Sequence, residues 1–171
     1  MVIDTQSRHH MQLSLAAELL RSFGGLRMTA LGVSMVPSLF PGDILTIRRE
    51  NTQNIRRGDM VLYWRDERFY VHRVVGKIGT SADVEWITRG DALTENDPSL
   101  TERELLGRVT LIQRDAAEWH PTLPSGLACF VQWGVRRSNT FLRIVLAGYL
   151  FYRRFARRIF AAGVLRPSGI G

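Results

Sequence analysis

The sequence is poor in several residues that mark particular classes of protein. Of its 171 residues one is a cysteine and one a lysine, Cys129 and Lys77. A lone cysteine cannot form an internal disulfide, and without clustered Cys and His it does not indicate a metal site, so we expect no metal or cofactor. We expect Cys129 to be a small buried apolar residue. Near the amino end no apolar run approaches the roughly 18 to 20 residues of a membrane span, and the polar first ten residues do not resemble a secretory signal peptide.

Acidic residues are missing from the last part of the chain. All 16 lie at or before Glu118, together with 15 basic residues, so residues 1–118 carry a net charge of −1. Residues 119–171 carry eight arginines and no acid. We therefore divide the chain into a near-neutral domain, residues 1–118, and a basic, apolar helical tail, residues 127–171. The stretch "WHPTLPSG", residues 119–126, contains two prolines and a glycine and is predicted to be a linker.

Apolar periodicity predicts a mainly β fold. A short amphipathic helix is expected near the amino end, in "MQLSLAAELLRSFGG". From residue 26 to residue 114 the pattern changes to short β-type segments separated by turns, namely "ILTIRR", "MVLYWR", "FYVHRVVG", "DVEWITR" and "GRVTLIQR". This spacing favours an antiparallel sheet or a small barrel.

Ser34 and His72 are the candidate nucleophile and base. Ser34 lies in "GVSMVPSLFPGD", and a serine is a weak nucleophile at neutral pH unless a base takes its proton. Among the four histidines only His72 lies in a predicted strand, where alternation places it on one face with Tyr70 and Val74. Each residue also has an ordinary interpretation, because Ser34 is suited to starting a turn and a strand histidine is commonly structural.

Four segments taken together resemble a known family. "GVSMVPSLFPGD", "RRGDMVLYW", "YVHRVVG" and "ITRGDALTEND" are similar, in order and spacing, to the type I signal peptidases of the LexA-like serine peptidase clan. His72-Arg73 stands where the bacterial branch has Lys-Arg, which is similar to the archaeal, endoplasmic-reticulum and sporulation branch with a histidine base. The resemblance, over roughly residues 30–112, implies an antiparallel β catalytic domain and a serine endopeptidase that cleaves a signal or leader peptide, with small residues preferred before the cut.

The resemblance also implies the roles of further residues. A carboxylate that orients His72 is expected from Asp91 or Asp97, and on the resemblance we prefer Asp91 and give Asp97 a supporting role. From the residues alone, Asp91 also fits a turn and Asp97 a helix cap. Ser34, Met35 and Pro37 are expected in the oxyanion and substrate-binding region. Signal peptidases often carry a hydroxyl two residues before the nucleophile, and this chain has Gly32 there.

Three other interpretations of the site are weighed against this one. Lys77 as the base is disfavoured because it stands beside glycines in a predicted exposed turn. A LexA-like self-cleaving repressor would use a lysine base and carry an Ala-Gly or Cys-Gly bond before the serine, and residues 1–33 contain neither. A non-catalytic peptide-binding module of the same fold stays open, and the missing hydroxyl at Gly32 is its support.

The tail indicates where the protein acts. Residues 141–152, "FLRIVLAGYLFY", are followed by "RRFARRIF", and twelve residues of helix, about 18 Å, are too short to span a bilayer. This composition favours a surface helix attracted to anionic lipid, with packing against the body or a partner protein as the alternative. Nucleic acid is disfavoured because interleaved stacking aromatics are lacking. We therefore expect a peripheral membrane protein with a cytoplasmic catalytic body and a peptide or preprotein substrate.

Overall fold

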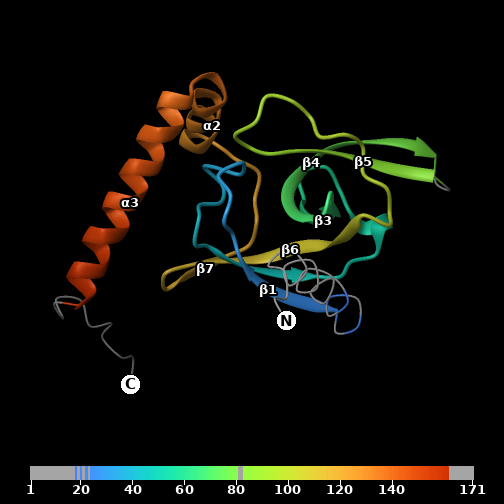
Figure 1. Ribbon diagram of the computed structural model, residues 1–171, viewed down its shortest axis with the longest axis horizontal. Coiled ribbons are helices and arrows are strands. Elements are labelled where there is room, and N and C mark those ends of the chain that lie inside the picture. Colours follow the sequence, from blue (N-terminus) through green and yellow to red (C-terminus); the bar gives the residue numbers. More distant parts are fainter. Residues whose placement is uncertain (1–17, 19, 21, 23, 81–82, 162–171) are drawn as a thin grey trace, which may run out of the picture.

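The computed structural model describes residues 18, 20, 22, 24–80 and 83–161 (Figure 1). Seven antiparallel strands form one sheet in this part of the chain, in the order β1-β2-β6-β3-β4-β5, and β7 pairs with β6. The strands are β1 (Gly25–Thr29), β2 (Ile44–Arg48), β3 (Met60–Arg65), β4 (Arg68–Thr80), β5 (Asp83–Arg89), β6 (Leu105–Arg114) and β7 (Ala117–Trp119). The prediction of a mainly β fold is confirmed, and β1 and β7 are additions to the predicted strands.

Residue alternation along β3 divides the core between the two faces of the sheet. Met60 and Leu62 pack in a first cluster with Leu45, Ile47 and Ile112. Val61 and Tyr63 point the other way, into a second cluster that contains Val74, Trp86 and Leu100. The alternation predicted for β4 agrees with this division, because Tyr70 and Val74 belong to the second cluster and Val71 packs against the first. A period of two is what lets one strand serve both clusters.

A tight turn fixes the register of β3 against β4. Asp66 and Glu67 join the two strands with φ values of 49° and 59°, the left-handed conformation that two-residue hairpin turns require. The register places Met60 opposite Arg73 and Val61 opposite His72. The position of His72 in the sheet is therefore set by the hairpin.

Only part of the predicted amino-terminal helix lies within the described residues. Glu18, Leu20 and Ser22 are helical, and Leu20 is fully buried in the first core cluster. A single turn of 3-10 helix, η1 (Thr52–Asn54), follows β2.

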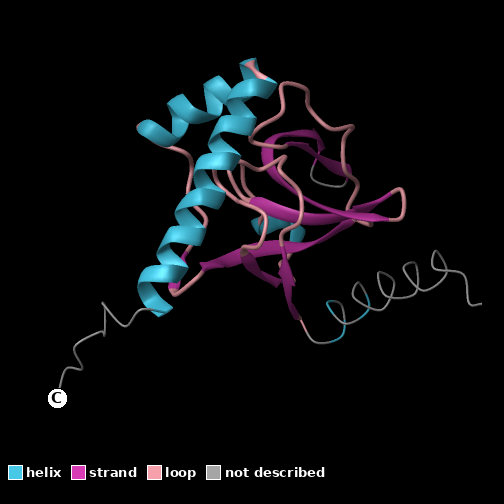
Figure 2. Cartoon of the chain, turned by 60° about the vertical axis from the view of Figure 1, so that its left-hand side comes forward, coloured by secondary structure: helices cyan, strands magenta, loops and turns pink. Residues whose placement is uncertain are grey.

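Two helices, α2 (Leu127–Arg137) and α3 (Asn139–Ala161), follow the linker and lie together beside the sheet (Figures 1 and 2). Their inner faces form a third core cluster with Val36 and Phe40, two residues of the segment between β1 and β2. The ring of Tyr149 stacks on that of Phe40 with centroids 4.1 Å apart. None of the described helices is both long and apolar enough to cross a membrane. Cys129, expected to be buried, is exposed on α2.

Candidate active site

The serine turn is the segment of residues 30–43 that joins β1 to β2. Met35 and Leu39 fill the first core cluster, while Val36 and Phe40 fill the third. Inside the turn, the N–H of Leu39 donates to the Met35 carbonyl at 2.9 Å, and the Val36–Pro37 peptide bond is cis. Apolar side chains thus hold the turn from two sides and leave Ser34 partly exposed between them.

His72 lies beside this serine. Its Nε2 is 3.0 Å from Ser34 Oγ, within the range of a hydrogen bond. The imidazole is buried, with an exposed fraction of 4% for the residue. Pairing with β3 holds the backbone of β4 at His72, so the imidazole is presented to Ser34 by a central part of the sheet. The structure therefore brings together the two residues selected from the sequence.

Asp97 completes a series of three residues. Its Oδ2 is 2.7 Å from His72 Nδ1 and also accepts a hydrogen bond from the Thr88 hydroxyl at 2.7 Å. Since a carboxylate only accepts, Nδ1 carries the proton and Nε2 is left to accept the Ser34 hydroxyl proton. The N–H of Asp97 donates to the Thr88 carbonyl at 2.8 Å, which folds the loop after β5 back onto that strand. No helix follows Asp97 in the described residues 98–104, so the helix-cap alternative is wrong.

The environment of Asp97 keeps it ionised. Partial burial acts to raise the pKa of this carboxyl, but hydrogen bonds from His72 and Thr88 outweigh burial and place the pKa below its usual value. Tyr63 of β3 also lies beside the imidazole, with its hydroxyl oxygen 3.2 Å from His72 Nδ1. Burial and the nearby Asp97 charge raise the pKa of Tyr63, so this phenol stays neutral. An imidazolium formed at His72 would face a fixed negative charge.

Asp91 does not contact His72, which corrects the expectation that it orients the imidazole. Both of its carboxylate oxygens accept hydrogen bonds from Arg73, at 2.9 and 2.7 Å. Ser38 of the serine turn also donates to Asp91 Oδ2, at 2.5 Å. Arg73 and Asp91 are both buried, and Arg73 also donates to the Gly58 and Thr122 carbonyls. Asp91 is thus part of a polar network that joins β4, the serine turn and the linker.

The loop that contains Asp91 also fixes the backbone of the nucleophile. The N–H of Ala92 donates to the Ser34 carbonyl at 2.8 Å. A Cβ atom placed on Gly90 would lie 2.7 Å from the same carbonyl oxygen, so only glycine fits beside it. From the tail, Arg136 of α2 donates to the Asp91 carbonyl at 2.9 Å. The loop is held between the serine turn and α2.

The remaining expected residues lie close to Ser34 but differ in exposure. Met35 is buried in the core, so its side chain has structural contacts. Pro37 lines a cavity of about 250 Å³ together with Met60, Arg114 and Leu123. Among the described residues, the N–H of Ser34 has no hydrogen-bond acceptor and is available to a ligand.

Lys77 is exposed within β4, not in a turn, with Nζ 5.7 Å from the centre of the Trp86 ring.

Two contributors to the site, Thr88 and Tyr63, were not predicted from the sequence. Thr88 lies in "DVEWITR" and Tyr63 in "MVLYWR", both predicted strands. Alternation alone would have placed Tyr63 on one face of β3, but only the register of the hairpin brings that face to His72. In the part of the chain that the structure describes, no three His, Cys, Asp or Glu residues gather in a way that would hold a metal ion.

No protein-family model and no curated protein matches this sequence. The chemistry of the site is therefore inferred from its own geometry.

Proposed function

We propose that this protein is a serine endopeptidase in which Ser34 is the nucleophile, His72 the general base and Asp97 the residue that orients and charge-balances His72. One observation carries the proposal: Ser34 Oγ, the two ring nitrogens of His72 and Asp97 Oδ2 form a continuous hydrogen-bonded series with distances of 3.0 and 2.7 Å. Nucleophile, base and orienting carboxylate in that order form the arrangement that activates a serine hydroxyl.

The acylation step follows from the protonation states. Ser34 Oγ attacks the carbonyl carbon of a peptide bond as its proton moves to His72 Nε2. The imidazolium then donates that proton to the leaving amine as the C–N bond breaks, which leaves an acyl group on Ser34. A water, deprotonated in turn by His72, attacks the acyl group and releases the carboxylate product. Asp97 stabilises the imidazolium in both halves of the reaction and stays ionised throughout.

The oxyanion of the tetrahedral intermediate needs hydrogen-bond donors. The N–H of Ser34 is the natural donor, because among the described residues it has no acceptor and the Ser34 carbonyl is held in place by Ala92. Gly32, two residues before the nucleophile, offers no side-chain donor. In this proposal backbone N–H groups supply the stabilisation at the oxyanion.

The substrate class rests on the sequence resemblance to type I signal peptidases with a histidine base. "GVSMVPSLFPGD" and "YVHRVVG" carry that resemblance, and they contain the two residues that lie 3.0 Å apart. We therefore propose cleavage of a signal or leader peptide after small residues. The proposal requires no cofactor.

The test is labelling with a fluorophosphonate, which reacts covalently with an activated serine. We expect labelling of the wild type and none of Ser34→Ala, with His72→Ala reduced by three orders of magnitude or more, about the effect of losing a triad member. Lys77→Ala tests the alternative base and is expected to label normally. Ser22→Ala, which changes an exposed serine of the amino-terminal helix, is the matched control.

Comparison of protein N-termini in cells that express the wild type or Ser34→Ala then identifies the substrate. New N-termini that require Ser34 would give the residues before the cut. A folded wild type that neither labels nor changes any N-terminus would overturn the peptidase proposal and favour the peptide-binding module.

A further inference from the structure

The exposed parts of α2 and α3 carry large apolar side chains. Phe130 and Trp133 of α2 are each 64% exposed, and Ile144 and Phe151 of α3 are 61% and 73% exposed. Singly exposed apolar residues are ordinary on a protein surface, but several large ones on adjacent elements mark an interaction surface. We name these four residues the outer apolar face.

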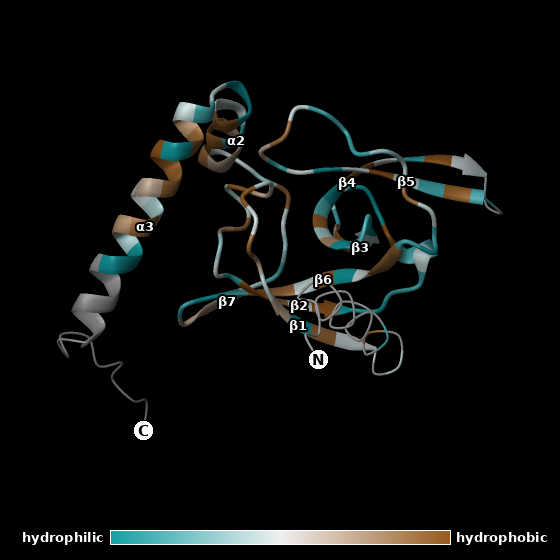
Figure 3. Cartoon of the chain, in the orientation of Figure 1, coloured by the Kyte–Doolittle hydropathy of each residue, from teal (hydrophilic) through white to brown (hydrophobic). Residues whose placement is uncertain are grey.

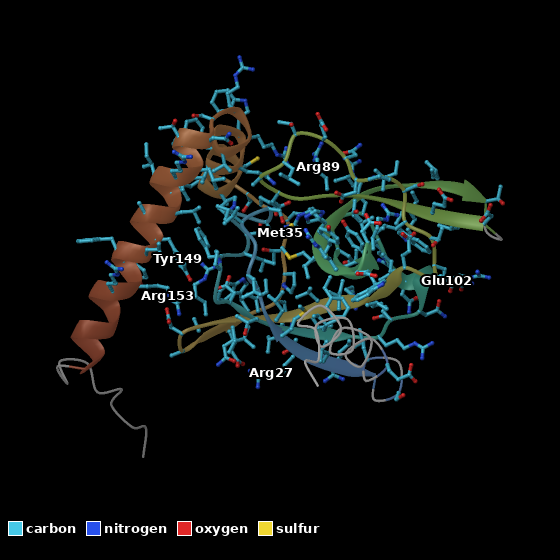
Figure 4. All side chains as sticks on the ribbon, viewed as in Figure 1. Arg27, Met35, Arg89, Glu102, Tyr149 and Arg153 are labelled. Atoms are coloured by element: carbon cyan, nitrogen blue, oxygen red, sulfur yellow. The ribbon has the colours of Figure 1, made fainter. Side chains whose placement is uncertain are left out.

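The inner faces of the same helices are already satisfied by the body of the protein. Val135 and Tyr149 are buried in the third core cluster, where Val145 and Leu146 also pack. Tyr149 and Arg153 point from α3 toward the strands (Figure 4). The outer apolar face is therefore not needed for contact between these helices and the sheet.

Helical spacing puts the named residues of each helix on one side of that helix. Ile144 and Phe151 are seven residues apart, about two turns of helix, so they lie one above the other on α3, roughly opposite Tyr149. Phe130 and Trp133 are three residues apart on α2, and their rings stack with centroids 6.1 Å apart. Apolar stretches alternate with polar ones along α3 (Figure 3).

The exposed charges on the two helices themselves have one sign. Arg137, Arg143 and Arg154 are exposed on the two helices. Residues 119–171 contain no aspartate or glutamate that would balance them. Aromatic and aliphatic side chains bordered by arginine, without acids, are the composition of helices that lie in a membrane interface.

We propose that the outer apolar face binds an anionic lipid surface, with α2 and α3 lying on the membrane. The arginines would approach lipid phosphates, and Phe130, Trp133, Ile144 and Phe151 would enter the boundary between headgroups and acyl chains. A lipid surface accommodates convex helical faces, whereas a protein partner would have to supply both an apolar groove and acidic groups. Since no described helix is able to span a bilayer, binding would be peripheral.

The proposal goes beyond the peptidase proposal and does not depend on it. The rings of Tyr149 and Phe40 connect α3 directly to the serine turn. Membrane-bound helices would therefore hold Ser34 at a fixed distance from the lipid surface.

The test is flotation of the full chain with vesicles of phosphatidylcholine alone or mixed with phosphatidylglycerol. We expect binding to the mixed vesicles and weak binding to the neutral ones. Phe130→Ser combined with Trp133→Ser should weaken binding at least about tenfold. Arg143→Gln combined with Arg154→Gln should weaken it about 25-fold, since each arginine near an anionic surface contributes roughly a fivefold factor.

A control variant makes one change of each kind, apolar to serine and arginine to glutamine, on another part of the surface. Ile78→Ser combined with Arg103→Gln alters an exposed isoleucine and an exposed arginine of the β domain and should float like the wild type. Failure of the wild type to float with mixed vesicles, or equal flotation of the wild type and the outer-face variants, would overturn the proposal. A dimer in solution that Trp133→Ser dissociates, without flotation of the wild type, would assign the face to a second copy instead. The same flotation test can be made with Ser34→Ala, which lacks the proposed nucleophile and keeps the outer apolar face. Failure of the membrane proposal is therefore distinguishable from failure of the peptidase proposal.

Discussion

Arg73 donates two hydrogen bonds to Asp91. Both side chains are buried, with exposed fractions of 6% for Arg73 and 2% for Asp91. The neighbouring His72 pairs with a different aspartate, Asp97. The two carboxylates, only six positions apart in one loop, thus have separate partners. One belongs to the fold and one to the candidate chemistry.

Substitution of the two aspartates should therefore give opposite results. Asp97→Asn should lower the rate of cleavage by about three orders of magnitude, because an amide neither fixes the His72 tautomer nor balances the imidazolium. The melting temperature should fall less than that of Asp91→Asn, because the Asp97 side chain is 15% exposed and is not paired with a buried arginine. Asp91→Asn should instead lower the free energy of unfolding by about 3 to 5 kcal/mol, because it leaves the buried Arg73 charge uncompensated. Thermal denaturation and fluorophosphonate labelling of both variants make the comparison; a stable Asp91→Asn protein would contradict it.

Gly90→Ala should displace the nucleophile. The added methyl group would lie 2.7 Å from the Ser34 carbonyl oxygen, which is backbone and already held by Ala92. A shift of about 1 Å at Ser34 should lower activity by about a hundredfold. Gly148→Ala is the control, since its Cβ meets nothing within 4 Å, and it should leave activity unchanged while stabilising α3 by about 0.5 to 1 kcal/mol. Full activity of Gly90→Ala would show that the turn adjusts freely.

Tyr149→Ala should weaken the packing of the serine turn against α3. It removes the ring that stacks on Phe40 and should lower the free energy of unfolding by about 3 kcal/mol. Tyr149→Phe separates ring from hydroxyl, because among the described residues the buried Tyr149 hydroxyl has no hydrogen-bond partner. The phenylalanine variant should be as stable as the wild type or more stable. Denaturant unfolding measures both; a destabilised Tyr149→Phe would mean that the hydroxyl is used.

Glu104 should contribute stability that disappears in acid. The hydrogen bond from Arg65 outweighs partial burial and lowers the pKa of Glu104 from 4.5 to about 2. A carboxyl with a lowered pKa in the folded state stabilises the protein above its unfolded pKa and loses this effect as the pH falls through the folded pKa. Glu104→Gln should thus cost about 1 kcal/mol at pH 7, given solvent screening, and nothing near pH 2. Glu102→Gln, a change of an exposed glutamate, is the control.

The strands and the pair of reactive residues were predictable because they depend on local patterns. Short β-type segments between turns identify β3 and β4, and His72 is the one histidine of the four that lies inside such a predicted strand, where it can serve a serine in a Pro-rich turn. The partner of His72 was not predictable in this way. Asp91 and Asp97 both follow β5, and the choice between them is made by contacts with Thr88 and Arg73 that depend on how the loop folds back.

The tail illustrates a second limit of local patterns. Periodicity and charge predict an amphipathic basic helix but do not say which surface its apolar side covers. The structure shows that α3 has two apolar faces, and that the one with Tyr149 covers the serine turn. The core cluster under these helices includes residues far earlier in the chain, such as Val36 and Phe40, which no local window of sequence contains.

His72 and Arg73 are adjacent on β4, and alternation sends their side chains to opposite sides of the sheet. Deletion of one residue between the hairpin turn and His72 would put Arg73 in the place of His72, and insertion of one residue would put Val71 there. Either change would turn the imidazole to the other face of the sheet. Both the reactive group and its structural partner would be lost at once. We expect the count of residues from Arg68 to Arg73 to stay constant among proteins that share this site.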